Sequence, residues 1–115
     1  MEANLYYVSS YNLKENKATE YQKWLISDEA KALFADFEAE TGWRYVESYW
    51  AIMGFGEYDV EDWWEIPDWA AFDKSRTSKA GDLLFARFNE LDFFDSSGTS
   101  STRMLRTSSD VRVFN

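Results

Sequence analysis

The chain has 115 residues, enough for one domain with a single core and too few for two. Neither cysteine nor histidine occurs, which excludes disulfides, thiolate nucleophiles and the commonest metal and haem ligands. The formal charge is -9, from 21 acidic and 12 basic residues, and such a charge repels phosphate backbones and anionic lipid surfaces. We expect one domain over residues 1–115 with no metal, no cofactor, no nucleic-acid partner and no membrane partner.

No window approaches the ~20 apolar residues of a membrane span, and the first residues lack the pattern of a secretory signal. We therefore expect a soluble cytoplasmic protein. Aromatic residues make up 19% of the chain and include six tryptophans. A core of this size does not need so many, so we expect some of them to line an interface or a ligand cavity.

The first two predicted elements are a strand and a broken helix. Residues 4–13 read as a strand with apolar side chains on both faces. From Lys17 the period changes to that of a helix, which ends at Thr41 and Gly42 because glycine accepts the left-handed conformation of a helix C-terminus. Ser27 can cap a second helical segment, so the pattern predicts a bend or break at that point.

A hairpin follows, with strands at residues 43–53 and 58–66 and a turn at residues 54–57. After it, Pro67 and Asp68 open a second helix, which the polar residues 75–81 divide into pieces at 68–75 and 79–91. A serine-rich loop leads to a last strand at residues 102–114. The order β-α-β-β-α-β predicts an α+β, ferredoxin-like domain, with an antiparallel four-stranded sheet and the helices on one face.

Such a fold leaves the second face of the sheet without a cover. Trp63 and Trp64 are neighbours on one strand, so each face carries a large aromatic side chain. We expect a second copy of the chain to cover the open face, sheet against sheet, in a homodimer.

The chain resembles the dimeric α+β barrel superfamily. The resemblance runs through the strand around Tyr7, the helix end at Gly42, the hairpin turn at Gly54 and the step from Trp64 to Asp68. This superfamily includes antibiotic-biosynthesis-type monooxygenases, haem-degrading enzymes, muconolactone isomerases and stress-responsive barrels. The resemblance implies paired ferredoxin-like subunits with a ligand pocket between the sheet and the helices of each. Without histidine, the chain departs from the haem-binding branches.

The register of the hairpin decides which side chains face the helices, because a slip of one residue exchanges the faces. We expect Ile52 to lie opposite Tyr58, because this register best separates polar from apolar side chains between the two faces. The helix-facing side then carries Val46, Ser48, Trp50, Ile52, Val60, Asp62, Trp64 and Ile66. The open side carries Tyr45, Glu47, Tyr49, Glu61, Trp63 and Glu65.

In this register Asp62 is the acidic side chain among the apolar residues of the helix-facing side, which makes it the candidate catalytic residue. As a functional group it would be a carboxyl with a raised pKa, orienting a ligand or moving a proton. The alternative is a structural carboxylate that pairs with Arg87, Arg106 or Arg112, or that reaches solvent at the sheet edge; we favour this alternative, since structural ion pairs also perturb carboxylates.

These features predict binding of a small hydrophobic or amphiphilic molecule, polyketide-like or fatty-acyl-like, between the sheet and the helices. The activity would be that of a cofactor-independent monooxygenase or an isomerase, and the alternative is a non-catalytic dimerisation module with a filled core. The expected ligand-binding residues come from the sheet and from both helices. They are Tyr7, Phe34, Phe37, Ser48, Trp50, Asp62, Trp64, Leu84 and Phe88.

Overall fold

The computed structural model describes residues 5–95 and 100–106. Its elements follow the predicted order, with each helical region divided into two helices. They are β1 (Leu5–Tyr11), α1 (Ala18–Leu25), α2 (Asp28–Thr41), β2 (Arg44–Ile52), β3 (Phe55–Ile66), α3 (Trp69–Ser75), α4 (Lys79–Leu91) and β4 (Ser100–Arg106).

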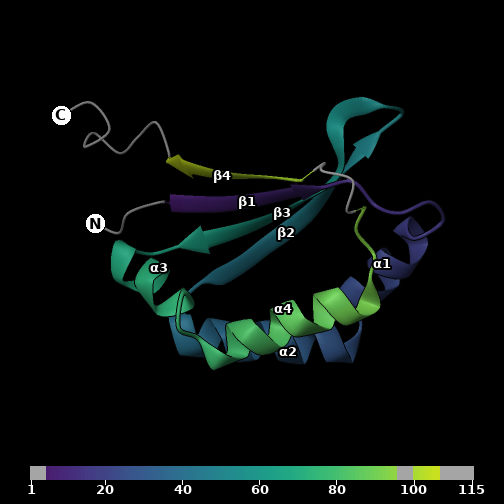
Figure 1. Cartoon of the computed structure of the whole chain (residues 1–115). Coiled ribbons are helices and arrows are strands. Elements are labelled where there is room, and N and C mark those ends of the chain that lie inside the picture. The colour runs from purple at the N-terminus through teal and green to yellow at the C-terminus, as the bar shows by residue number, and fades with distance from the viewer. Residues whose placement is uncertain (1–4, 96–99, 107–115) are drawn as a thin grey trace.

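The strands form one antiparallel sheet in the order β2-β3-β1-β4. Helices α2 and α4 lie side by side beneath one face of this sheet, and no helix of the described residues covers the opposite face (Figure 1). The predicted α+β, ferredoxin-like architecture is therefore confirmed. Residue 4 of the predicted first strand and residues 107–114 of the predicted last strand lie outside the described residues.

Both predicted helix breaks occur where the sequence places a capping side chain. The Ser27 Oγ accepts a hydrogen bond from the Ala30 N–H at 3.2 Å and begins α2. Ser78 accepts from the Gly81 N–H at 2.9 Å and begins α4. Gly42 ends α2 with φ 86°, a left-handed conformation in which a Cβ would be strained.

The register of the β2–β3 hairpin was predicted correctly only in its middle. Ser48 lies opposite Asp62 and Trp50 lies opposite Val60, as expected. The predicted pairing of Ile52 with Tyr58 is wrong, because Ile52 pairs with Phe55 and the chain reverses at Met53 and Gly54. Both turn residues have positive φ, at 56° and 77°, as in the two-residue hairpin turns that follow the twist of the strands.

A β-bulge near the start of β2 corrects a second expectation. Tyr45 lies opposite Trp64, whereas Glu47 lies opposite Trp63, so Val46 is the additional residue between these two pairs. The bulge places Tyr45 with Trp64 on the helix-facing side, not on the open side as predicted. Val46 is 43% exposed, although the regular alternation assigned it to the buried side.

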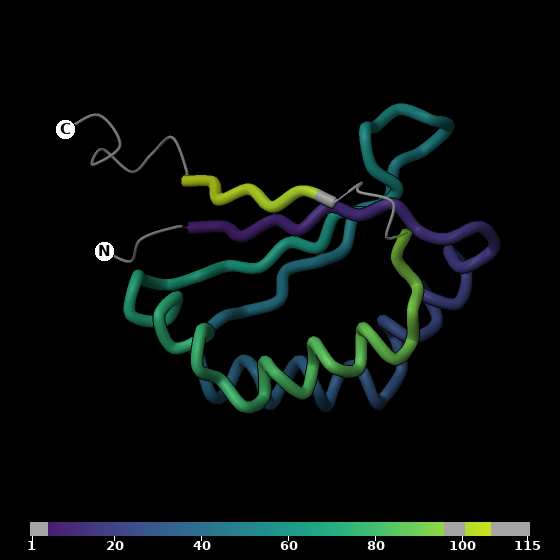
Figure 2. The backbone as a smooth tube through the Cα atoms, in the orientation of Figure 1, coloured from purple at the N-terminus to yellow at the C-terminus, as the bar shows by residue number. Residues whose placement is uncertain are grey.

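The open face of the sheet carries an aromatic row that crosses three strands. Trp63 of β3 lies between Tyr6 of β1 and Tyr49 of β2, with both ring centroids 5.9 Å from its own. The Glu61 carboxylate lies beside this row and accepts hydrogen bonds from Ser10 at 3.1 Å and from Arg103 at 3.0 Å. The tip of the hairpin rises past this face, away from the helices (Figure 2).

Candidate functional site

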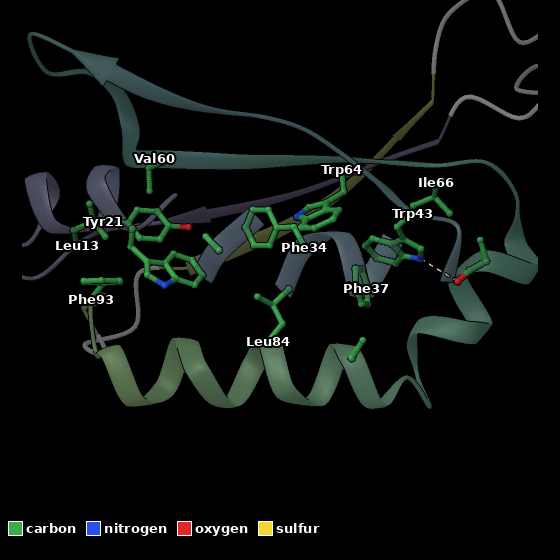
Figure 3. Packing of buried hydrophobic residues seen from close by; sticks show 14 of the residues in the cluster. Leu13, Tyr21, Phe34, Phe37, Trp43, Val60, Trp64, Ile66, Leu84 and Phe93 are labelled. Atoms are coloured by element: carbon green, nitrogen blue, oxygen red, sulfur yellow. Dashed lines mark hydrogen bonds between the residues drawn. The ribbon is translucent and has the colours of Figure 1, made fainter. Parts of the chain in front are cut away.

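A cleft of about 390 Å³ lies between the helix-facing side of the sheet and helices α2 and α4; we call it the inner cleft. Its walls are mostly aromatic. Figure 3 shows Phe34 and Trp64 side by side beneath β3, with Leu84 rising toward them from α4. The cleft contains seven of the nine expected ligand-binding residues. These are Tyr7, Phe34, Phe37, Asp62, Trp64, Leu84 and Phe88.

The aromatic walls of the inner cleft hold one another in place through edge-on contacts. The Trp64 ring lies 5.2 Å from Phe34 and 5.4 Å from Phe37, and both pairs have edge-to-face geometry. Trp43 closes one end, where its indole N–H donates to the Ala71 carbonyl at 2.9 Å (Figure 3). The cleft therefore has rigid apolar sides, which reduces the entropy lost when a ligand binds.

Ser48 and Trp50, the other two expected ligand-binding residues, do not line the inner cleft. They line a second cleft of about 840 Å³, which lies between the edge strand β2 and helices α1 and α2; we call it the outer cleft. The reason is their position on β2, an edge strand, whereas Asp62 and Trp64 are on the interior strand β3. Phe34 lines both clefts.

Asp62 lies at the sheet side of the inner cleft and is 5% exposed. Its Oδ2 accepts a hydrogen bond from the Tyr21 hydroxyl at 2.7 Å, and its Oδ1 accepts one from the Ser48 hydroxyl at 2.5 Å. Burial raises the pKa of Asp62 to about 6, although the two hydroxyl donors lower it in part. The carboxyl is therefore protonated in mildly acidic solution and ionised in mildly alkaline solution.

The predicted arginine partners do not pair with Asp62 in the described part of the chain. Arg87 instead binds Glu29, with its Nε 2.6 Å from the Glu29 Oε1. Arg106 is on β4, the strand at the opposite edge from β2, and Arg112 lies outside the described residues. Two neutral hydroxyls therefore bind this carboxyl, and no positive charge from the described residues offsets its burial.

Tyr21 is the site residue that the sequence interpretation missed. It recurs with Trp24 at the spacing of one face of a helix, and its side chain is fully buried. The hydroxyl nevertheless reaches Asp62, and burial together with that carboxylate raises the pKa of Tyr21 well above the ordinary value. It therefore remains a neutral donor. A buried tyrosine needs a hydrogen-bond partner, and that requirement was the available signal.

Tyr45 extends the hydrogen-bonded chain into the outer cleft. The bulge in β2 turns it toward the helices, where its hydroxyl contacts the Ser48 hydroxyl. Asp62, Ser48 and Tyr45 thus form a continuous polar connection between the two clefts, surrounded by aromatic rings. Tyr11, on the wall of the inner cleft, has its pKa raised to about 12 by burial, so this phenol also stays neutral near pH 7.

No group of three or more acidic side chains that could hold a metal ion occurs in residues 5–95 and 100–106. Within the same residues, no helix is long and apolar enough to cross a membrane. The chemistry that the described site offers is apolar enclosure plus one carboxyl able to accept or donate a proton near neutral pH.

No protein-family model matches the chain, and no curated protein matches it. Solved structures are similar over nearly its whole length. An uncharacterised NIPSNAP-like domain protein from Burkholderia xenovorans is 15% identical, with a TM-score of 0.68 over 96% of this chain and 90% of that one. A dabb family protein from Mesorhizobium loti with a ferredoxin-like fold is 16% identical, with a TM-score of 0.62 over 90% and 96%.

A dimeric protein of unknown function from Bacteroides fragilis, also with a ferredoxin-like fold, is 10% identical, with a TM-score of 0.58 over 90% of this chain and 96% of that one. The fold of the chain is ferredoxin-like. The ferredoxin-like fold that the resemblance implied is therefore confirmed. At identities this low the similarity establishes the fold alone, so any function has to be argued from the clefts themselves.

Proposed function

We propose that the protein binds a small hydrophobic or amphiphilic molecule, polyketide-like or fatty-acyl-like, in the inner cleft. The observation that carries this proposal is a cleft of about 390 Å³ with aromatic walls and a single buried carboxyl. That volume is within the range of small-molecule sites, and such sites combine apolar walls with a few polar groups that fix orientation.

Asp62 supplies the polar group of the proposed site. When protonated it donates a hydrogen bond to a carbonyl or hydroxyl of the ligand, and when ionised it accepts a proton from an acidic O–H or C–H group. Tyr21 and Ser48 hold the carboxyl in one orientation during either event. A carboxyl that exchanges its proton near neutral pH is what an isomerase or a cofactor-independent monooxygenase would use.

The proposal also includes a homodimer, in which the open faces of two sheets pack together. The row of Tyr6, Trp63 and Tyr49 supplies the apolar centre, and Glu61, Glu65 and Arg103 supply a polar rim. The similar protein from Bacteroides fragilis is described as dimeric. Sheet-to-sheet packing would remove the row from water and leave the inner cleft, on the other face, open to ligand.

The test is mass spectrometry of small molecules that copurify with the protein under native conditions. Asn89→Trp places a large ring at the rim of the inner cleft, whereas Glu90→Trp places the same ring on an adjacent exposed position that does not line it. We expect the wild type and Glu90→Trp to retain a common apolar or amphiphilic molecule that Asn89→Trp lacks. Equal retention by all three proteins would refute the proposed site.

The alternative function is a non-catalytic dimerisation module with a filled core. It predicts that no molecule is retained and that Asp62→Asn changes only stability. The ligand hypothesis predicts that Asp62→Asn weakens ligand binding while the dimer stays intact, because the substitution removes the ionisable group without altering the open face. Ligand titration by calorimetry, followed by sedimentation of the same samples, separates the two functions.

A further inference from the structure

The outer cleft is larger than the inner one and belongs to no part of the proposed function. It lies at the edge of the sheet, where β2 has no neighbouring strand on its outer side in the described chain. Its volume of about 840 Å³ is sufficient for a small molecule. Two of its lining residues, Ser48 and Trp50, were expected to face a ligand, and here they do face a solvent-accessible cleft.

Helix α1 presents a second face to this cleft. Tyr21 and Trp24 are buried in the core, whereas Gln22, Lys23 and Ile26 line the cleft with helical spacing. Ile26, directly after the last residue of α1, is 73% exposed although its side chain is entirely apolar. Together with Leu25 and Trp50, which also pack against the core, it gives the cleft an apolar wall.

The charged residues that line the outer cleft differ in their partners. Lys23 and Lys31 line it, and neither makes an ion pair with any residue that the structure describes. Glu38 and Glu47 also line it, but each carboxylate accepts a backbone N–H of β2, at 2.8 Å and 2.9 Å. These neutral donors leave both carboxylates charged, so the lining carries two charges of each sign. Each carboxylate has a backbone N–H partner, whereas the two ammonium groups make no ion pair with a described residue and can accept an anionic ligand group.

The outer cleft is separated from the inner cleft by a wall one side chain thick. Phe34 lines both, and its ring is held by Tyr45 at 4.8 Å and by Trp64 at 5.2 Å. Beside this ring, the hydrogen bond from Ser48 to Asp62 closes the polar part of the wall. A ligand in the outer cleft would therefore meet the Tyr45 and Ser48 hydroxyls and would not reach the Asp62 carboxyl.

We propose that the outer cleft is a second binding site, for an apolar molecule that carries a carboxylate. The Lys23 and Lys31 ammonium groups bind the carboxylate, and Ile26, Leu25 and Trp50 enclose the apolar body. The hydroxyls of Tyr45 and Ser48 hydrogen-bond to any polar group deeper in the ligand. This site goes beyond the proposed function, because it needs neither the inner cleft nor a reaction.

The test is a calorimetric titration with sodium decanoate below its critical micelle concentration. In the double variant Lys23→Gln/Lys31→Gln we expect decanoate affinity to fall by about fivefold to tenfold, since each partly exposed ion pair contributes a modest amount. The matched control is Lys74→Gln/Lys79→Gln, which changes the net charge equally at positions away from the cleft, and it should keep the wild-type affinity. Decanol, which has no charge, should bind both double variants equally.

A second pair of variants tests the apolar wall. Ile26→Glu should abolish decanoate binding by repelling the carboxylate, whereas Leu83→Glu, at an exposed position on α4 that does not line either cleft, should not. The proposal is overturned if decanoate binds both lysine double variants equally, or if it binds none of the proteins. It is also overturned if Asn89→Trp removes binding and Lys23→Gln/Lys31→Gln does not, since decanoate then occupies the inner cleft and supports the proposed function instead.

Discussion

The Asp62→Asn substitution should change the pH dependence of stability. Burial raises the pKa of this carboxyl from 3.8 to about 6 in the folded protein. Well below pH 4 the carboxyl is protonated in both the folded and unfolded states. Between pH 4 and 6 the unfolded chain releases the proton first, so the free energy of unfolding falls as the pH rises. A pKa difference of this size corresponds to about 3 kcal/mol, lost by the wild type across this range.

Asparagine has no proton to lose, so Asp62→Asn lacks this decline. We expect the stability of the variant relative to wild type to rise by up to about 3 kcal/mol between pH 4 and pH 7 and then to level off. Any constant cost of fitting the amide between Tyr21 and Ser48 changes the offset of this curve and not its slope. The substitution is therefore informative even if the variant is the less stable protein at low pH.

The assay is urea denaturation followed by tryptophan fluorescence, at one protein concentration, from pH 4 to pH 8. Asp36→Asn is the matched control, because it removes the same formal charge from an exposed position on α2. A stability difference between Asp62→Asn and wild type that is constant across this range, or that falls as the pH rises, would refute the argument that Asp62 is held in a desolvated site.

Three further predictions concern the dimer, the hydroxyl that orients Asp62 and a helix end. Trp63→Glu should give monomers in sedimentation velocity, because it places a charge in the centre of the open face. The control Trp69→Glu, at an exposed position on α3, should sediment as the wild type does, and a dimeric Trp63→Glu protein would contradict the sheet-to-sheet interface. Tyr21→Phe should destabilise the protein by about 1–3 kcal/mol and raise the pKa of Asp62 further, because the carboxylate loses a hydrogen-bond donor. Carboxyl-carbon NMR measures this pKa, and an unchanged value would count against the hydrogen bond. Gly42→Ala should cost about 1 kcal/mol in urea denaturation because of its φ of 86°, and no loss would mean that the helix ends elsewhere.

The order of elements was predictable because several independent local signals agreed. Ser27, Gly42 and Asp68 were expected to cap helix ends at changes in hydrophobic period, and each does so in the structure. Alternating polarity in β3 also assigned Val60, Asp62, Trp64 and Ile66 correctly to the buried face. These are properties of short segments, which a single sequence reports well.

Features that depend on one residue of register were not predictable in the same way. The bulge at Val46 and the turn at Met53 and Gly54 change the pairing at both ends of the hairpin, and neither leaves a distinct signal in the alternating pattern. As a result Tyr45 was assigned to the wrong face. Ser48 and Trp50 were assigned to the correct face but the wrong cleft, because the order of strands across the sheet decides which helix lies beneath them.

The central claim is that the inner cleft holds a ligand, and a crystal structure of the protein purified under native conditions tests it most directly. We predict elongated electron density between Trp64 and α4, with a polar end within hydrogen-bonding distance of the Asp62 carboxyl. A cleft closed by direct contact of Leu84 and Phe88 with the sheet, and no density between them, would contradict the claim.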